Sequence, residues 1–199
     1  MIHSNTQIQC LSLFDGEPKY KTIDEIYQEY CHKEQVVWKG KGSEKISTID
    51  FTDDIKLKIT DSYGWTDLLY ITRVPMLKPI NSWVQINVAD KNVIVSNCEY
   101  IPAYKITLPR IGFHGEVKYN YICKTSTNIN GDDYLRLYRG RDNNGDMIEF
   151  AHITSIEEVN DEFNYGFILT TKSKFYNANR IHLFSNTGTG KEENISDYK

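Results

Sequence analysis

Hydrophobic and polar residues alternate along much of the first half of the chain, and this alternation predicts β-strands. Residues 55–60 alternate strictly, as expected for a strand with one face buried and the other in water. Residues 65–74 predict a second strand, which a proline then ends. Residues 83–88 alternate again, and the polar turn at 89–92 leads directly into the apolar segment 93–96. This order predicts a β-hairpin.

The second half of the chain shows the same pattern. Residues 134–138 and 147–153 predict two strands, and the Asp-Asn-Asn-Gly-Asp segment at 142–146 is the strongest turn signal in the sequence. Two further strands are predicted at 162–171 and 175–184. Together these segments imply an all-β fold, built from about a dozen short antiparallel strands.

One segment has the spacing of a helix instead. Residues 23–30 carry apolar side chains at positions 23, 26, 27 and 30, which form one helical face. Thr22 precedes this segment, and Glu25 lies three positions after Thr22, which predicts a capping box. We therefore expect one short helix near the N-terminus. Residues 187–199 are polar and aperiodic, and we expect a flexible tail there.

Composition narrows the possible functions. The chain has 199 residues and a formal net charge of -4, which argues against a dedicated nucleic-acid or membrane-surface partner. No segment approaches the roughly 20 apolar residues of a membrane span, and the start does not resemble a signal peptide. The four cysteines contain no CxxC pair, so we expect neither a metal site nor a disulfide framework. These features predict a cytoplasmic monomer without a cofactor.

The segments 4–8, 15–16 and 21–26 resemble the opening sequence block of inteins, the self-splicing domains of the hedgehog–intein (Hint) family. That block begins with a Cys or Ser nucleophile, and Met1 occupies the corresponding position here. A second alignment begins at Cys10 and leaves too few residues for the usual first strand. We therefore favour Met1 as the position of the N-terminal nucleophile and keep Cys10 as the alternative nucleophile.

A second block resembles the Thr-x-x-His motif of inteins. The corresponding sequence is Val-Ser-Asn-Cys-Glu at 95–99, in which Ser96 takes the place of the threonine. Either Cys98 or Glu99 stands where inteins usually have histidine. That histidine polarises the scissile peptide bond, so its absence matters, and Cys98 could take over this task or act as a surrogate nucleophile.

The last block is the most specific part of the resemblance. It runs from residue 153 to Asn186 and is followed by Thr187, as inteins end in His-Asn followed by Cys, Ser or Thr. His182 lies four residues before Asn186 and is not assumed to replace a missing histidine. Three residues depart from the family pattern, namely Gly166 for an aspartate, Lys174 for a histidine, and Ser185 for the penultimate histidine.

The resemblance implies one all-β, horseshoe-shaped Hint domain over residues 1–186, with both ends at its centre. A small insertion, roughly residues 105–150, would stand in place of a homing endonuclease. The implied activity is autocatalytic protein splicing, a single-turnover reaction whose partners are the flanking extein segments. An acyl shift at residue 1 would precede cyclisation of Asn186 and release of Thr187.

Met1 is a difficulty for this reaction, because a thioether has no proton to lose. Either the first step is lost and only C-terminal cleavage remains, or Met1 is a start residue in place of a native cysteine. One alternative function is a catalytically degenerate Hint-like structural or binding module of a phage or viral protein. Another is an unrelated β-sandwich binding domain. For Cys98, the alternatives are a reactive thiol and a buried core cysteine.

Overall fold

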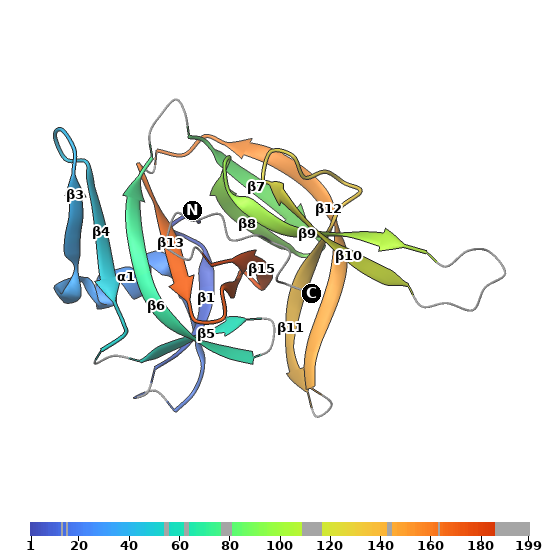
Figure 1. Cartoon of the computed structure of the whole chain (residues 1–199), viewed down its shortest axis with the longest axis horizontal. Helices are drawn as coiled ribbons and strands as arrows, with labels where there is room; N and C mark the ends of the chain where they lie inside the picture. Colours follow the sequence, from blue (N-terminus) through green and yellow to red (C-terminus); the bar gives the residue numbers. More distant parts are fainter. Residues whose placement is uncertain are drawn as a thin grey trace.

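The computed structural model describes residues 1–12, 14, 16–53, 56–61, 64–76, 81–108, 117–142, 145–162 and 164–185. Within these ranges the chain forms two antiparallel sheets, one α-helix and one short 3₁₀ segment (Figure 1). The predicted all-β fold with one short helix near the N-terminus is confirmed. Among the described residues, no helix is long and apolar enough to cross a bilayer. Asn186, Thr187 and the predicted tail 187–199 lie outside the described residues.

The first sheet is organised around one long strand, β6. Its strand order is β2-β1-β5-β6-β4-β3, and β13 also pairs with β6. Its strands are β1 (Gln7–Ser12), β2 (Lys19–Thr22), β3 (Gln35–Lys39), β4 (Lys45–Asp50), β5 (Leu57–Asp61), β6 (Gly64–Pro75) and β13 (Tyr165–Thr171). The first part of β6 pairs with β5, and its later part pairs with β4 on one edge and β13 on the other.

The second sheet has the order β10-β9-β11-β12-β7-β8, with β15 paired to β11 and β14 paired to β15. Its strands are β7 (Trp83–Val88), β8 (Lys91–Ser96), β9 (Tyr100–Thr107), β10 (Lys118–Thr125), β11 (Tyr134–Asp142), β12 (Gly145–Val159), β14 (Phe175–Ala178) and β15 (Ile181–Phe184). The β7–β8 and β11–β12 hairpins match the two hairpins predicted from the sequence. The segment 105–150, predicted as an insertion, supplies β10, β11 and parts of β9 and β12.

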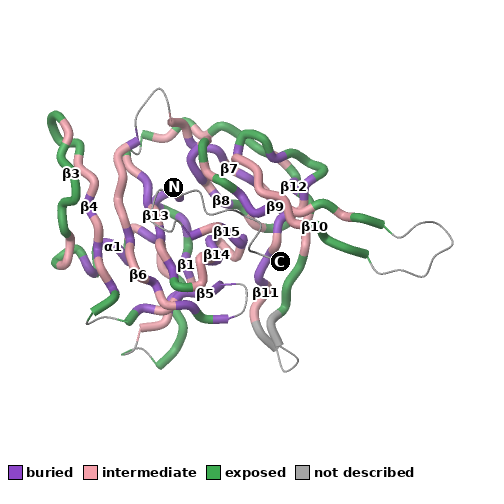
Figure 2. The backbone as a smooth tube through the Cα atoms, viewed as in Figure 1, coloured by how far each residue is buried: buried purple, intermediate pink, exposed green. Residues whose placement is uncertain are grey.

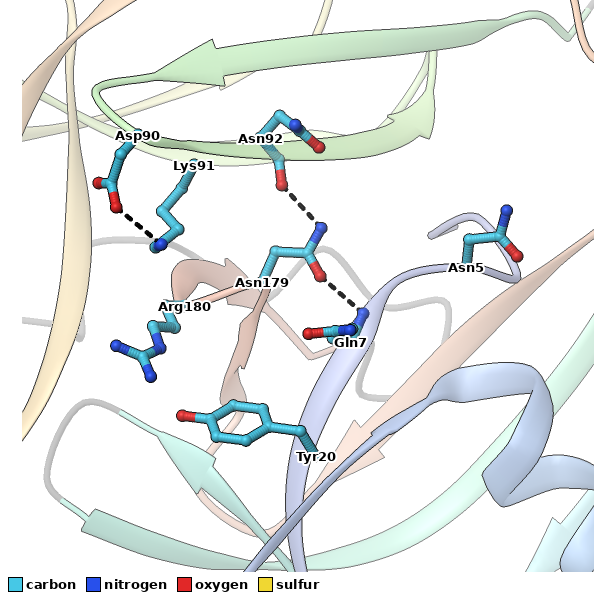
Figure 3. A pocket seen from close by; sticks show the side chains of 8 residues that line it. All are labelled: Asn5, Gln7, Tyr20, Asp90, Lys91, Asn92, Asn179 and Arg180. Carbon is cyan, nitrogen blue, oxygen red and sulfur yellow. Dashed lines mark hydrogen bonds and ion pairs between the residues drawn. The ribbon is translucent and has the colours of Figure 1, made fainter.

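The prediction of a single strand over 175–184 is wrong. The segment folds into two strands joined at Asn179 and Arg180, which both have positive φ angles, 48° and 67°. The Asn179 side chain fixes this turn, because it accepts a hydrogen bond from the Gln7 N–H (2.6 Å) and donates one to the Asn92 carbonyl oxygen (2.7 Å). Figure 3 shows the turn beside an open polar groove, in which the Arg180 guanidinium lies 5.4 Å from the centre of the Tyr20 ring.

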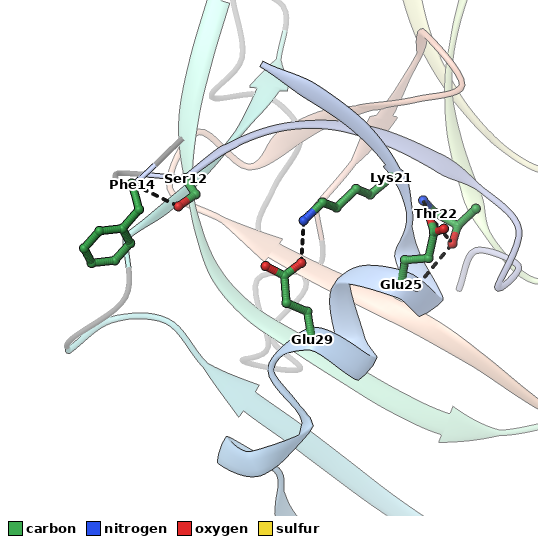
Figure 4. A network of polar contacts seen from close by, with 6 residues as sticks. All are labelled: Ser12, Phe14, Lys21, Thr22, Glu25 and Glu29. Carbon is green, nitrogen blue, oxygen red and sulfur yellow. Dashed lines mark hydrogen bonds and ion pairs between the residues drawn. The ribbon is translucent and has the colours of Figure 1, made fainter. Parts of the chain in front are cut away.

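The predicted helix is α1 (Ile23–Glu29), followed by the 3₁₀ segment η1 (Cys31–Lys33). The predicted capping box is present (Figure 4). The Glu25 N–H donates to the Thr22 hydroxyl (3.2 Å), and the Thr22 N–H donates to the Glu25 carboxylate (2.7 Å). The hydrogen bonds from Thr22 lower the pKa of the Glu25 carboxyl group. The cap therefore fixes where the helix begins, at the end of β2.

The hydrophobic core follows the middle of both sheets and continues under the helix. Figure 2 shows the buried segments gathered along the central strands, whereas β3 is exposed along its whole length. Residues from nearly every strand contribute to a single cluster, in which Ile2, Phe167 and Leu183 are fully buried. The first residues of the chain and the last described strand therefore share one core.

Candidate functional site

The first three residues lie along the seam between the two sheets. Ile2 pairs with Phe167 of β13 on one side and with Val95 of β8 on the other. The Ile2 N–H donates to the Phe167 carbonyl oxygen (2.8 Å), and the Phe167 N–H donates back to Ile2 (3.0 Å). The His3 N–H donates to the Ile94 carbonyl oxygen (3.0 Å). Because both sheets hold this segment, residue 1 has a defined position between them.

The residues predicted around the N-terminal position meet at Met1. The backbone N–H of Ser96 donates to the Met1 carbonyl oxygen at 3.0 Å. The Glu99 carboxylate contacts the Met1 nitrogen. The Ser96 hydroxyl oxygen lies 3.5 Å from the sulfur of Cys98. The structure thus brings Met1, Ser96, Cys98 and Glu99 together, and Glu99 is the residue whose side chain contacts the Met1 nitrogen.

A hydrogen-bonded turn holds Glu99 in place. The Glu99 N–H donates to the Ser96 carbonyl oxygen (3.0 Å) at the end of β8. Ser126, which is fully buried, donates its hydroxyl to the same Ser96 carbonyl oxygen (2.8 Å) and its N–H to the Glu99 carbonyl oxygen (2.7 Å). Cys98 lies within this turn and is exposed, so the alternative of a buried core cysteine is wrong.

The surroundings of the Met1 nitrogen disfavour an isolated charge. Burial lowers the pKa of the Met1 α-amino group, and the nearby Cys98 thiol opposes this shift. The contact with the Glu99 carboxylate also favours the charged amine, because an opposite charge compensates for lost hydration. A positive charge on this nitrogen therefore has the Glu99 carboxylate beside it to compensate for the lost hydration.

Ser185 ends the described chain, and its side chain is turned into the sheet. The Ser185 hydroxyl oxygen accepts a hydrogen bond from the Thr171 N–H (2.6 Å), and the hydroxyl donates to the Leu169 carbonyl oxygen (3.2 Å). The Ser185 N–H donates to the Lys174 carbonyl oxygen (2.9 Å). The Ser185 side chain is buried, and its only proton is already donated. Its role is therefore structural, because it holds the end of β15 against β13.

The two ends of the described chain meet at one small recess. Met1, Glu99, Tyr176, Phe184 and residues 167–169 line it. Figure 1 shows β15, the last described strand, in the central part of the molecule. The recess therefore lies between residue 1 and the strand that leads to Asn186.

No protein-family model and no curated protein matches the sequence. Solved structures do match. The transcription factor IIB Mvu mini-intein is 19% identical with a TM-score of 0.65, covering 92% of this chain and 98% of that chain. An intein from a hyperthermophile is 11% identical with a TM-score of 0.66, over 92% and 98% of the two chains. The Pab PolII intein is 13% identical with a TM-score of 0.62, over 94% and 100%. 

The chain has the intein fold. The identities are low, so what these proteins share with this chain is the architecture, which extends over nearly their full lengths. The expectation of an all-β Hint fold is confirmed, and the alternative of an unrelated β-sandwich is wrong.

In this intein fold, packing explains why Gly166 replaces the expected aspartate. A Cβ atom at position 166 would lie 2.8 Å from Cη2 of Trp83 and 3.1 Å from the Met1 Cβ. Trp83 is only 1% exposed, so its ring fills the space that a longer side chain would need. Position 166 therefore has no room for a Cβ atom while Trp83 and residue 1 keep their positions.

The other two departures, Lys174 and Ser185, are joined by a backbone hydrogen bond. Lys174 adopts a positive φ of 66° in the turn before β14, and its carbonyl oxygen accepts a hydrogen bond from the Ser185 N–H.

The His182 ring stacks on Phe175, with ring centres 4.7 Å apart. Burial lowers the pKa of His182 to about 3, and Arg136 contributes to the shift. His182 is therefore neutral at physiological pH, as a buried part of the intein core.

Cys10, the alternative nucleophile, lies in the middle of β1. It is 5% exposed and pairs with Lys19 of β2 on one edge and Ile59 of β5 on the other. The intein fold thus places Cys10 in the core of the first sheet, with strands on both sides. Met1, by contrast, lies at the recess.

Two residues of this region were not predicted from the sequence, namely His3 in the N-terminal segment and Tyr176 at the recess. His3 is buried, and its Nε2 lies 2.9 Å from a carboxylate oxygen of Asp161, while its Nδ1 accepts a hydrogen bond from the Asn5 N–H (3.2 Å). The His3 ring also contacts the Trp83 ring edge-on, with centres 5.1 Å apart. Tyr176, the second residue, lines the recess itself. His3 lies outside the intein-like blocks, and Tyr176 lies within the last block at a position to which the resemblance gives no role.

Proposed function

We propose that this chain is an intein-type self-processing domain, with its N-terminal junction at residue 1, beside the recess that Met1 and Phe184 line, and its C-terminal junction between Asn186 and Thr187 in the sequence. The observation that supports this proposal is the contact of the Glu99 carboxylate with the Met1 nitrogen. That nitrogen is the atom released from its peptide bond in the first step of splicing. The partners are the flanking segments of the same precursor, and the reaction needs no cofactor because every reacting group belongs to the polypeptide.

At the N-terminal junction, the side chain of residue 1 attacks the preceding carbonyl carbon. The peptide C–N bond breaks, and the nitrogen of residue 1 becomes an amine that must gain a proton. The thiol of residue 1 loses its proton as its sulfur bonds to the carbon, and we assign the transfer of this proton to the nitrogen to the Glu99 carboxylate, because it contacts that nitrogen. The Ser96 N–H holds the carbonyl group of residue 1 in position. A thioether cannot perform the attack, so we expect the first step with Cys at position 1 and not with Met1.

At the C-terminal junction, the Asn186 side-chain nitrogen attacks its own backbone carbonyl carbon. The bond to Thr187 breaks, Thr187 gains a free amine, and the domain ends in a succinimide. This step does not depend on the side chain of residue 1. We therefore propose that the chain with Met1 performs C-terminal cleavage alone, and that the Met1→Cys variant splices.

A two-tag precursor tests the proposal. One folded tag precedes residue 1, a different tag follows Thr187, and mass spectrometry identifies the products over time. With Met1 we expect release of the C-terminal tag, and with Met1→Cys we expect ligation of the two tags. Asn186→Ala should abolish both products. If neither precursor changes in mass over days, the proposal is wrong, and the degenerate structural or binding module becomes the better description.

The role of Glu99 has its own test in the Met1→Cys background. A thiol reagent releases the N-terminal tag once the acyl shift has occurred, so the rate of release reports on that step. Glu99→Gln keeps the size of the side chain and removes its acid, and we expect release to slow by about 100-fold. Glu158→Gln removes an exposed carboxylate on β12 and serves as the matched control. Equal rates for the two variants would exclude proton delivery by Glu99.

A further inference from the structure

Each of the four polar atoms of His3 has a hydrogen-bond partner, and the residue is only 1% exposed. Its backbone N–H donates to the Ile94 carbonyl oxygen (3.0 Å), and its carbonyl oxygen accepts from the Thr6 N–H (3.0 Å). In the ring, Nδ1 accepts from the Asn5 N–H (3.2 Å), and Nε2 lies 2.9 Å from a carboxylate oxygen of Asp161. Because Nδ1 acts as an acceptor, the ring proton lies on Nε2 and is donated to Asp161. The buried ring is therefore held in one orientation.

Asp161 connects His3 to the strand that pairs with the N-terminal segment. It lies between the end of β12 and the start of β13. Further along, β13 holds Ile2 through the two backbone hydrogen bonds with Phe167. The bond between His3 and Asp161 adds a side-chain link between the same two segments. A hydrogen bond to a carboxylate is roughly twice as strong as one between neutral groups, so this link contributes to the position of the first residues.

The His3 ring also borders Trp83, which packs beside residue 1. The two rings meet edge-on, with centres 5.1 Å apart. Trp83 pairs with Ser96, whose N–H donates to the Met1 carbonyl oxygen (3.0 Å). A Cβ atom at position 166 would lie 2.8 Å from the Trp83 ring and 3.1 Å from the Met1 Cβ, so the indole ring and residue 1 border the same space. His3 therefore helps to fix the indole ring next to residue 1.

We propose that His3, held by Asp161, is a positioning residue for the N-terminal junction, which keeps the nitrogen of residue 1 against the Glu99 carboxylate. This inference rests on the proposed function. The ring proton of His3 is committed to Asp161, and Nδ1 is committed to the Asn5 N–H, so His3 acts through the segment it holds and not as an acid or a base. Position matters for the acyl shift, because a displacement of about 1 Å can slow a reaction by about 100-fold.

The test compares two substitutions of His3 in the Met1→Cys background, with thiol-induced release of the N-terminal tag as the readout. His3→Asn keeps an acceptor near the position of Nδ1 but does not reach Asp161, and we expect release to slow by about 10-fold. His3→Gln presents an N–H near the position of Nε2 and should recover most of the rate. Asp161→Ala should slow release as His3→Asn does, and it should cancel the recovery by His3→Gln. His32→Asn makes the same change at an exposed residue of η1 and is the control.

Two further measurements separate positioning from a general loss of stability. Thermal unfolding reports whether each variant is folded. C-terminal cleavage by the Met1 chain carrying the same substitutions should be unchanged, because the link lies at the other junction. Asp161 is 27% exposed, so Asp161→Ala leaves the core intact and decides the question if His3→Asn does not fold.

The outcomes distinguish this inference from the proposed function. Slow release by His3→Asn and Asp161→Ala, with recovery by His3→Gln and normal C-terminal cleavage, supports His3 as the positioning residue. Release at the parent rate in both slowed variants, failure of His3→Gln to recover the rate, or equal slowing at both junctions overturns the inference and leaves the proposed function standing. If the Met1→Cys parent itself releases no tag with thiol, the proposed chemistry at residue 1 is wrong, and the inference falls with it.

Discussion

The close packing of Gly166, Trp83 and Met1 gives a prediction with a defined magnitude. A Cβ atom at position 166 would be 2.8 Å from the Trp83 ring and 3.1 Å from the Met1 Cβ. Carbon atoms in contact prefer about 3.5–4.0 Å, so both neighbours would have to move by several tenths of an ångström. Such overpacking of a core typically costs about 1–3 kcal/mol. We expect Gly166→Ala to lower the free energy of unfolding by about 2 kcal/mol.

Urea unfolding followed by far-ultraviolet circular dichroism measures this change without relying on tryptophan fluorescence. Trp83→Phe removes the atom that the new Cβ would meet, so the double variant with Gly166→Ala should be more stable than the sum of single effects predicts, by about 1 kcal/mol or more. Gly16→Ala is the control, because its Cβ would meet nothing within 4 Å. Strictly additive effects, or a Gly166→Ala effect as small as that of Gly16→Ala, would refute the packing argument.

Three further predictions concern stability. Ser185→Ala removes the acceptor of the buried Thr171 N–H, so the free energy of unfolding should fall by about 1–3 kcal/mol, and an unchanged urea midpoint would contradict this. The pKa of His182 is about 3 in the folded chain and about 6.5 in the unfolded chain. Between these pH values the unfolded state binds more protons, so the free energy of unfolding falls as the pH is lowered. His182→Gln should reduce that fall by up to about 1.4 kcal/mol per pH unit, measured as urea midpoints at pH 7 and 5. Thr22→Ala should cost about 1 kcal/mol by thermal unfolding, and Thr22→Ser should recover most of it by keeping the bond from the Glu25 N–H.

The alternation of side chains predicted the strands that have one buried face. β7 alternates between core and partly exposed positions, and it forms the predicted hairpin with β8. β3 carries no buried residue, so no alternation marked it. The turn at Asn179 and Arg180 was missed because Arg180 occupies a positive-φ position that is usually filled by glycine. Where tertiary contacts hold a turn, its local sequence can look like a strand.

The residues of the candidate site also fall into two groups, those that the sequence could predict and those that it could not. Met1, Ser96 and Glu99 could be predicted because they belong to sequence blocks with a known order. The contact of His3 with Asp161 joins residues 158 positions apart, and nothing in either local sequence indicates it. The place of Tyr176 depends on how β14 folds back on β15. Such residues become visible only once distant strands are paired.

The double pairing of Ile2 has a consequence for the order of events during synthesis. Ile2 bonds to a strand of the first sheet and pairs with a strand of the second, and those strands lie on opposite sides of residue 1. In a nascent chain whose Phe167 has not yet been translated, Ile2 can pair with β8 but not with β13. The surroundings of residue 1 are therefore complete only after β13 has been translated and docked. Under the proposed function, chemistry at residue 1 therefore waits until the domain is complete, and an unfinished precursor is not cut.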